Sequence, residues 1–381
     1  MTVQGLIERH PRLVRVFDFL LPLLATLGAL AIGAVMLILL KANPLEAYSA
    51  LLEGAFGSKN ALADTLVKAT PLLLVGLGIC IAFRGGVINI GGEGQLVVGA
   101  VAGTLVGLTF PDASGWLIIP SALLVGFLAG GIWGGIPGVL KAYFNVNEIL
   151  STIMMNQIAV QGMNYLLRGP MIDPVQLEAA SRIPQTARLS AQFDLPRLIP
   201  TRLHLGTGLA ILAAFLVFIF LWRTTIGYRI RAVGLNPHAS RYAGVNVKRY
   251  IVLSLLLSGA FAGLAGVIQV YGVNHRMFTD GSATGFTGGA GFNGIVAALF
   301  GQLHPLGTIP ASFLFGALLV GANKLQRAVQ VPSALITALN GLVVVFVVSI
   351  ELGRRRLTRL RTAETKEEAP PSTDAEAEVV S

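Results

Sequence analysis

The sequence predicts an all-α fold, that of a polytopic membrane protein with about ten transmembrane helices. Its 381 residues are 54% hydrophobic and only 12% charged, whereas soluble domains carry about 25% charged residues. Between Asp280 and Lys324 the only ionisable side chain is His304. Because a helix crosses a bilayer with about 20 apolar residues, this stretch is long enough for two crossings.

Charge-poor stretches of suitable length give the individual spans. They lie at residues 19–40, 66–83, 87–107, 116–140, 149–167, 207–222, 250–272, 286–300, 306–322 and 332–350. The 286–300 stretch is short and glycine-rich, which favours a broken or re-entrant helix. The first span follows three arginines, as in a signal peptide, but its apolar run exceeds the about 7–15 residues of a signal core. We therefore expect it to be retained, and nine or eleven spans remain alternatives to ten.

The distribution of basic residues predicts the orientation. With ten spans both termini share a side, and the loops on that side hold most of the Lys and Arg residues, which makes it the cytoplasm. We expect a cytoplasmic N-terminus at 1–18, a transmembrane domain at 19–350 and a cytoplasmic, largely disordered tail at 351–381. Within the domain, 168–205 forms a proline-rich extracytoplasmic loop and 223–249 a cytoplasmic loop. Because topology accounts for the net charge of +9, we predict no nucleic-acid partner.

Glycines recur at helical spacing inside the apolar stretches. The pattern Gly-x-x-x-Gly occurs at Gly99/Gly103/Gly107, Gly126/Gly130/Gly134/Gly138 and Gly259/Gly263. Membrane helices use this spacing to bring their backbones close together. The pattern therefore predicts tight helix packing.

The densest polar cluster inside a span is Asn89-Ile-Gly-Gly-Glu93-Gly-Gln95, which follows Gly85 and Gly86. Polar side chains are costly in a bilayer and indicate either a pathway or a structural polar contact. Glycines allow a helix to break so that its backbone lines a cavity. Two interpretations stay open: Asn89, Glu93 and Gln95 line a substrate path, or they hold helices together.

A second polar set lies on and before the fifth span. Its candidate site residues are Asn147, Glu148, Asn156, Gln157, Gln161 and Asn164. Gln157, Gln161 and Asn164 recur at i, i+4 and i+7, which places them on one helix face. Such a stripe faces water or protein, so a translocation path and interhelical hydrogen bonding are equally open interpretations.

The segment Gly288–Gly294 resembles the 85–95 region in being short, glycine-rich and polar, and it contributes Phe292 and Asn293 as candidates. Ten spans give opposite orientations to halves that start at the second and seventh spans. Paired interrupted helices in such halves indicate a substrate path. We therefore also predict that the fold contains inverted structural repeats with broken helices.

The loop 223–249 contains a predicted short helix. Asn236 followed by Pro237 is a helix-start signal, and Gly244 suits the end of the helix. A two-turn helix over Pro237–Ala243 is too short to persist alone in water, so it needs a surface on which to dock. The membrane surface is one alternative, and a soluble partner protein is favoured.

The sequence contains no recognisable motif for ATP binding, metal binding or catalysis. No G-x-x-x-x-G-K-[ST] phosphate loop occurs, Cys80 is the single cysteine, and the five histidines are scattered. This pattern excludes the usual device for binding ATP and offers no cluster of metal ligands or catalytic groups. We predict that the chain is not an enzyme and holds no metal or cofactor.

Three segments carry a family resemblance: Asn89–Gln95, Val146–Asn156 and Arg231–Gly244. Together and in this order they resemble permeases of ATP-binding-cassette (ABC) importers, in the ribose/branched-chain amino-acid permease superfamily. Within it, the chain is similar to permeases that accompany Bmp-type nucleoside-binding lipoproteins.

The resemblance implies a function. It is that of a permease subunit in the bacterial inner (plasma) membrane that translocates nucleosides or related ribose-bearing solutes, with ATP hydrolysed on a separate chain. The implied partners are a cytoplasmic ABC ATPase with duplicated cassettes, a second homologous permease chain, an extracytoplasmic substrate-binding lipoprotein and membrane lipid. The implied ATPase-coupling residues are Gly234, Asn236, Pro237, Ala239, Arg241, Ala243 and Gly244.

A non-transport membrane scaffold or receptor, in which the polar stripe is only structural, is one rival of this interpretation. Two transport alternatives also stay beside it. One is a permease for simple sugars, since the polar path residues suit any hydroxyl-rich solute. The other is an ion-coupled secondary transporter, although such proteins use several intramembrane carboxylates, and Glu93 is nearly alone here.

Overall fold

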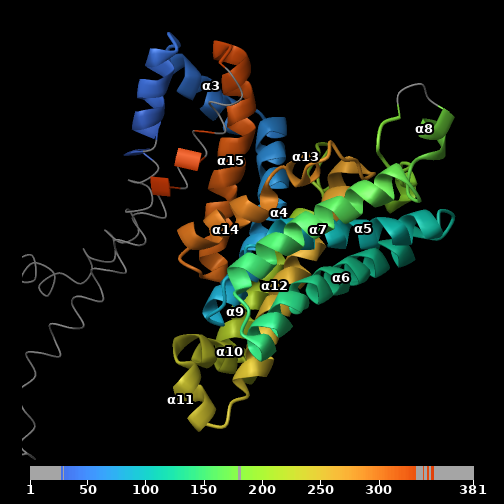
Figure 1. The fold of residues 1–381 in the computed structure, drawn as a ribbon. Coiled ribbons are helices and arrows are strands. Elements are labelled where there is room, and N and C mark those ends of the chain that lie inside the picture. Colours follow the sequence, from blue (N-terminus) through green and yellow to red (C-terminus); the bar gives the residue numbers. More distant parts are fainter. Residues whose placement is uncertain are drawn as a thin grey trace, which may run out of the picture. The chain divides into compact units, whose positions relative to one another are not determined.

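The computed structural model describes residues 27–28, 30–178 and 182–331, together with positions 338, 341, 342, 345 and 346. The chain divides into two compact units, residues 1–36 with 337–381 and residues 37–336. The candidate site and the groove discussed below belong to the second unit, whose helices Figure 1 labels. The predicted N-terminus (1–18) and tail (351–381) lie outside the described residues, as does most of the predicted last span (332–350).

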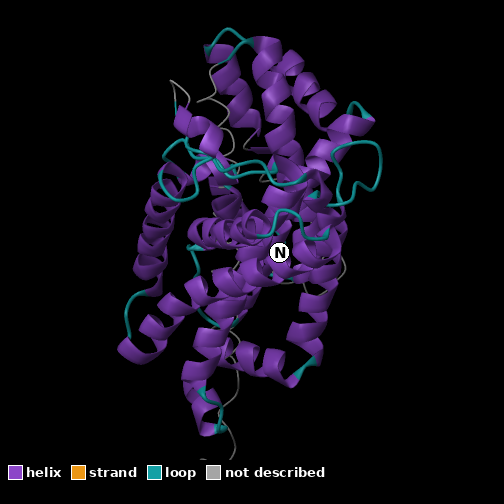
Figure 2. Ribbon diagram, turned by 90° about the vertical axis from the view of Figure 1, so that its right-hand side faces the viewer, coloured by secondary structure: helices purple, strands orange, loops and turns teal. Residues whose placement is uncertain are grey.

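The second unit is built of helices in its described part, without a strand (Figure 2). In chain order they are α3 (Pro44–Phe56), α4 (Lys59–Arg84), α5 (Gly92–Thr109), α6 (Gly115–Phe144), α7 (Glu148–Arg168), α8 (Pro174–Glu178), η1 (Ala191–Phe193), α9 (Leu205–Arg223), α10 (Thr225–Leu235), α11 (Pro237–Tyr242), α12 (Val247–Gln269), η2 (Val270–Asn274), α13 (Ala283–Thr287), α14 (Ala290–Phe300) and α15 (Pro305–Val329).

The lengths of these helices fit a membrane protein. Five are long and apolar enough to cross a bilayer: α4, α6, α9, α15 and the continuous segment α12–η2. Two shorter apolar helices cover Leu30–Leu39 and α14. The predicted all-α, polytopic fold is confirmed, while the number of ten spans stays a prediction.

Glycine-to-backbone contacts hold the centre of the bundle together, where α12 packs against α4, α5 and α6. A Cβ on Gly263 of α12 would overlap the carbonyl oxygen of Gly126 in α6, and one on Gly130 would lie 2.5 Å from the carbonyl oxygen of Gly259. A Cβ on Gly99 of α5 would overlap the backbone of Gly263. The predicted tight packing is confirmed at these sites, because any larger residue would force the helices apart.

Two of the predicted spans are interrupted. The prediction starts a span at residue 87, but α5 begins only at Gly92, since the chain leaves helical geometry after Arg84. Val87, Ile88 and Ile90 are apolar, so hydropathy alone includes them in the membrane span. The predicted broken helix at 286–300 is confirmed: α13 ends and α14 begins at Gly288 and Gly289, which both have positive φ (62° and 75°).

The loop between α7 and α9 packs on the segment that follows α12. Residues 184–195 form backbone hydrogen bonds with residues 271–279, such as Thr186 N to Met277 O at 2.9 Å. Its described part contains only α8 and η1, so the proline-rich sequence forms no long helix there. In Figure 1, α8 and the start of α4 lie at one end of the bundle and α11 lies at the other.

Candidate functional site

The break between α4 and α5 begins with two glycines. Gly86 adopts φ +76°, a conformation that glycine reaches without steric cost. Gly85 lies so close to Ser254 of α12 that a Cβ there would overlap the serine hydroxyl. The sequence therefore ends α4 at Arg84, and residues 85–91 form no helix before α5 begins at Gly92.

Asn89 is the centre of a fully buried hydrogen-bond network in this break. Its Nδ2 donates to Gln95 Oε1 at 2.9 Å and to Ser258 Oγ of α12 at 2.8 Å. Its Oδ1 accepts from the Gly91 amide at 2.8 Å and from Gln95 Nε2 at 3.1 Å. All hydrogen-bonding capacity of the Asn89 side chain is thus used to fix the break against α5 and α12.

Two residues of α7 satisfy the backbone at the start of α5. Asn156 Oδ1 accepts from the Gly94 amide at 2.8 Å, while its Nδ2 donates to the Ile90 carbonyl at 2.9 Å. The hydroxyl of Thr152 accepts from the Ile90 amide at 3.4 Å. Because Gly91 offers no capping side chain, Asn156 takes over that role from another helix.

Glu93 caps a helix that is distant in sequence. Its Oε1 accepts from the amides of Gly291 (3.0 Å) and Phe292 (3.3 Å), in the first turn of α14. A carboxylate there complements both the unpaired N–H groups and the positive end of the helix dipole. Oε2 is buried with no hydrogen bond to the described residues.

The buried part of the candidate site therefore consists of contacts between helices. Asn89, Glu93, Gln95 and Asn156 are at most 5% exposed. Of the two interpretations left open by the sequence, their contacts support interhelical hydrogen bonding. A role of these residues in a substrate path stays a prediction.

The stripe on α7 lies elsewhere, on a face that the described protein leaves uncovered. Gln157 and Gln161 are exposed, and Asn164 is half-buried, with its Oδ1 accepting from the Thr279 hydroxyl at 2.6 Å. A groove of about 480 Å³ at this end of α7 is lined by Gln161, Asn164, Tyr165, Arg168 and Gly169. The sequence thus predicted the shared face correctly, and the structure separates it from the buried network.

The remaining path candidates have local roles or stand at the edge of the network. Asn147 caps α7 by accepting from the Ile149 amide at 2.9 Å. Glu148 forms an ion pair with Lys141 at 2.9 Å. Phe292 is 48% exposed and Asn293 half-buried in the first turns of α14, next to the amides that bind Glu93.

The predicted short helix in loop 223–249 is confirmed. Helix α11 covers Pro237–Tyr242, Asn236 Oδ1 caps it by accepting from the Ala239 amide at 3.0 Å, and Gly244 follows with φ +77°. Arg241 and Tyr242 of this helix are exposed, as is Ala239. Helix α11 is therefore a preformed helix with an exposed face at this end of the molecule.

Gly234 lies between helix α11 and the break between α4 and α5. A Cβ on Gly234, near the end of α10, would overlap the Arg84 carbonyl oxygen, and one on Gly86 would lie 2.9 Å from Gly234 Cα. Beside this contact, the Trp222 ring of α9 lies 5.5 Å from the Arg84 guanidinium and 5.3 Å from that of Arg231. The segment α10–α11 thus packs backbone to backbone on the end of α4.

The sequence interpretation missed several of these residues. Thr152, Ser258, Trp222 and the Gly291 amide all complete the network or its surroundings. No local signal identifies them, except that Thr152 lies one helical turn before Asn156. Among the described residues, no three His, Cys, Asp or Glu side chains come together to hold a metal ion.

A multi-helix membrane bundle with interrupted helices and a buried polar network is typical of membrane transport proteins. A family described as branched-chain amino acid transport system / permease component matches residues 61–348. The chain belongs to this family. It is a multi-pass permease subunit of the plasma membrane that works with further subunits, and it is not an enzyme.

Curated relatives cover most of the chain. It is 39% identical to the guanosine ABC transporter permease protein NupP of Bacillus subtilis, over 88% of this chain and 94% of that protein. It is 33% identical to the glucose ABC transporter permease protein TsgB13 of Haloferax volcanii (88% of each chain) and 31% identical to the nucleoside ABC transporter permease protein NupB of Lactococcus lactis (86% and 90%). No solved structure matches the chain.

Proposed function

We propose that this permease imports nucleosides in an ABC transporter. The observation that carries the proposal is the 39% identity to a guanosine permease over nearly the whole of both chains. The 31% identity to a second nucleoside permease supports it. Simple sugars are the second candidate substrates, because a glucose permease is 33% identical over a similar length.

The substrate path follows the exposed face of α7. Gln157, Gln161 and Asn164 offer amide donors and acceptors on one face, which suits the hydroxyl groups and base edges of a neutral nucleoside. A second, homologous permease chain would cover this face and close the path. The buried network around Asn89, Glu93 and Gln95, with Asn156, fixes the helices behind it, and Phe292 and Asn293 lie at its margin.

Helix α11 is the docking element for the ATPase. Its exposed residues, its Asn236 cap and the Gly244 terminus support a preformed helix that fits a groove on a cytoplasmic ATPase with duplicated cassettes. When the ATPase closes on ATP, α10–α11 moves as a unit, since both are short helices joined at Asn236. The Gly234 contact would carry this motion to Arg84 and the break.

The orientation follows from this assignment. If α11 faces the cytoplasm, the opposite end, with loop 168–205, receives solute from a substrate-binding lipoprotein. Both termini would be cytoplasmic, in agreement with the bias of Lys and Arg residues.

Uptake in cells with and without the gene tests the proposal. We expect deletion to abolish ATP-dependent uptake of radiolabelled guanosine and to leave glucose uptake unchanged, with restoration by a plasmid copy. Loss of glucose uptake alone would establish the sugar candidate. Guanosine uptake that persists after ATP depletion but needs an ion gradient would contradict the ABC mechanism.

A further inference from the structure

A large groove opens at the end of the bundle opposite α11, between α4 and α15. Its volume is about 770 Å³. Its walls come from one face of α4, with Asp64 and Lys68, and one face of α15, with Asn323, Lys324 and Arg327. Arg202 from the loop before α9 completes the rim.

The charges of the groove are predominantly basic. It contains four basic residues, Lys68, Arg202, Lys324 and Arg327, against the carboxylates of Glu53 and Asp64. Lys324 is neutralised by an ion pair with Glu53 at 2.5 Å. No carboxylate among the described residues lies within ion-pair distance of the other three cations. They therefore leave the groove with a net positive field.

Lys68 lies near the start of the predicted span at 66–83. It lies nine residues after Lys59, about 13 Å along the axis of α4 from its start, inside one of the five helices apolar enough to cross a bilayer. Ionisable residues at such positions are costly and face a cavity or a binding partner. Lys68 is exposed into the groove rather than covered by protein.

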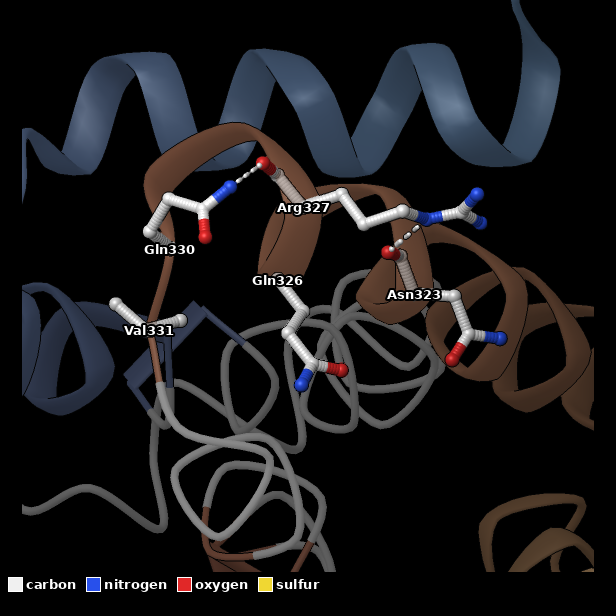
Figure 3. Close-up of a pocket in the computed structure, with 5 residues that line it drawn as sticks. All are labelled: Asn323, Gln326, Arg327, Gln330 and Val331. Atoms are coloured by element: carbon white, nitrogen blue, oxygen red, sulfur yellow. Dashed lines mark hydrogen bonds between the residues drawn. The ribbon is translucent and has the colours of Figure 1, made fainter.

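The groove is amphipathic. Beside its charged residues, the lining includes the apolar side chains of Val67, Val273 and Val320. At the end of α15 it adjoins a smaller pocket of about 360 Å³ that shares Asn323 and Arg327 and adds the amides of Gln326 and Gln330 (Figure 3). Cations beside apolar side chains, near the ends of helices apolar enough to cross a bilayer, match a phosphate group joined to an apolar body.

We propose that this groove binds a phosphate-bearing ligand, with Lys68, Arg202 and Arg327 on the phosphate. The favoured source of that phosphate is the headgroup of a membrane phospholipid, whose glycerol and first methylenes would lie on the valines. A soluble phosphate compound shares the chemistry and is separated from it by the experiment. The inference does not depend on the transported solute.

Native mass spectrometry of the full chain in a neutral detergent tests the proposal. Phosphatidylglycerol is added to one sample and a diacylglycerol with the same acyl chains, which lacks phosphate, to another. We expect adducts with phosphatidylglycerol only. Lys68→Gln should weaken them by about tenfold or more, because a charge-assisted hydrogen bond contributes about 1.5–3 kcal/mol. Lys59→Gln, on the same helix but outside the groove, is the matched control and should bind like the wild type.

Two further measurements keep the result decisive. Arg327→Gln should also weaken the adducts, and unchanged melting temperatures would exclude misfolding as the cause. Equal binding of both lipids, or equal effects of Lys68→Gln and Lys59→Gln, would overturn the proposal. If inorganic phosphate displaces the phospholipid, the phosphate site stands but its ligand is a soluble compound.

Discussion

Glu93 joins two distant parts of the chain through one carboxylate oxygen. This oxygen accepts hydrogen bonds from the amides of Gly291 and Phe292. Because both amides lie in the first turn of α14, they have no acceptor within that helix. Sequence reasoning identified Glu93 as a polar residue of interest. It could not identify the partner, because the partner is a backbone group rather than a side chain.

The first prediction follows from this contact. Glu93→Ala leaves two buried amides unsatisfied and should destabilise the protein by about 1–3 kcal/mol. Glu93→Gln keeps an acceptor oxygen and should cost less. Melting temperatures of the purified variants in detergent measure the difference. If Gln destabilises as much as Ala, the negative charge rather than the acceptor holds α14.

His204 gives a prediction for pH. It lies buried before α9, where its Nδ1 accepts from the Gly206 amide at 3.2 Å. Burial, with nearby His275 acting in the same direction, lowers the pKa of His204 from 6.5 to about 4.

Because the folded state prefers the neutral imidazole, the unfolded chain takes up the proton first as pH falls. Stability should therefore be complete above pH 6.5 and decline towards pH 4, by about 3 kcal/mol in total from this group. Melting temperatures across this window measure the decline. His204→Gln should flatten it, whereas His238→Gln, on exposed α11, should not. A decline that His204→Gln leaves unchanged would assign the effect to other groups.

At the scale of single elements, local signals predicted α11 correctly. Asn236, Pro237 and Gly244 each fix one backbone feature by their own chemistry, so neighbours in sequence suffice. The glycines also indicated a break before α5, but the predicted span started at residue 87, five residues before the helix begins at Gly92. The apolar residues of the break look like a helix, and only Gly85 and Gly86, read with their contacts to Ser254 and Gly234, show that the chain turns there.

Gly234 provides the third prediction. Gly234→Ala places a methyl group against the Arg84 carbonyl oxygen, and such overpacking costs about 1–3 kcal/mol. We expect α10 to shift and transport per ATP hydrolysed to fall while the ATPase remains bound. Gly208→Ala is the control, since a Cβ at Gly208 of α9 would meet nothing within 4 Å. Unchanged coupling in Gly234→Ala would contradict the proposed transmission.

Asn236 provides the fourth prediction. Asn236→Ala removes the cap of α11, and loss of such a cap costs about 1 kcal/mol. Helix α11 is too short to absorb this loss, so co-purification of the ATPase should weaken. Asn246→Ala removes an equivalent cap from the long helix α12 and should have little effect on the ATPase. Equal retention of the ATPase by both variants would argue against docking through α11.

At the scale of the whole molecule, the sequence predicted which polar residues lie together, but not which other parts of the protein cover them. From the sequence, the stripe on α7 and the cluster at 89–95 were each open to two interpretations, a substrate path or hydrogen bonding between helices. In the structure the first faces outward and the second is enclosed by α5, α7 and α12. Helical periodicity defines a face, while the identity of what covers that face depends on contacts between residues far apart in the chain.

The fifth prediction tests the outward face. Cys80 is buried and is the single cysteine of the chain. Maleimide labelling of an introduced cysteine can therefore be measured without a background from Cys80. If α7 lines a water-filled path in the assembled transporter, Gln157→Cys and Gln161→Cys should react with a membrane-impermeant maleimide. Ile158→Cys, equally uncovered on the same helix, should react far more slowly. Equal labelling of all three variants, or labelling of none, would contradict a water-filled path along this face of α7.

The bond between Glu93 and Gly291 spans 198 positions of the chain. During synthesis, α5 enters the membrane long before α14 is made. When α14 emerges, its first amides have no acceptor in its own segment, and lipid offers none. We therefore expect the first turn of α14 to acquire its acceptor only when the second half of the protein packs on the first.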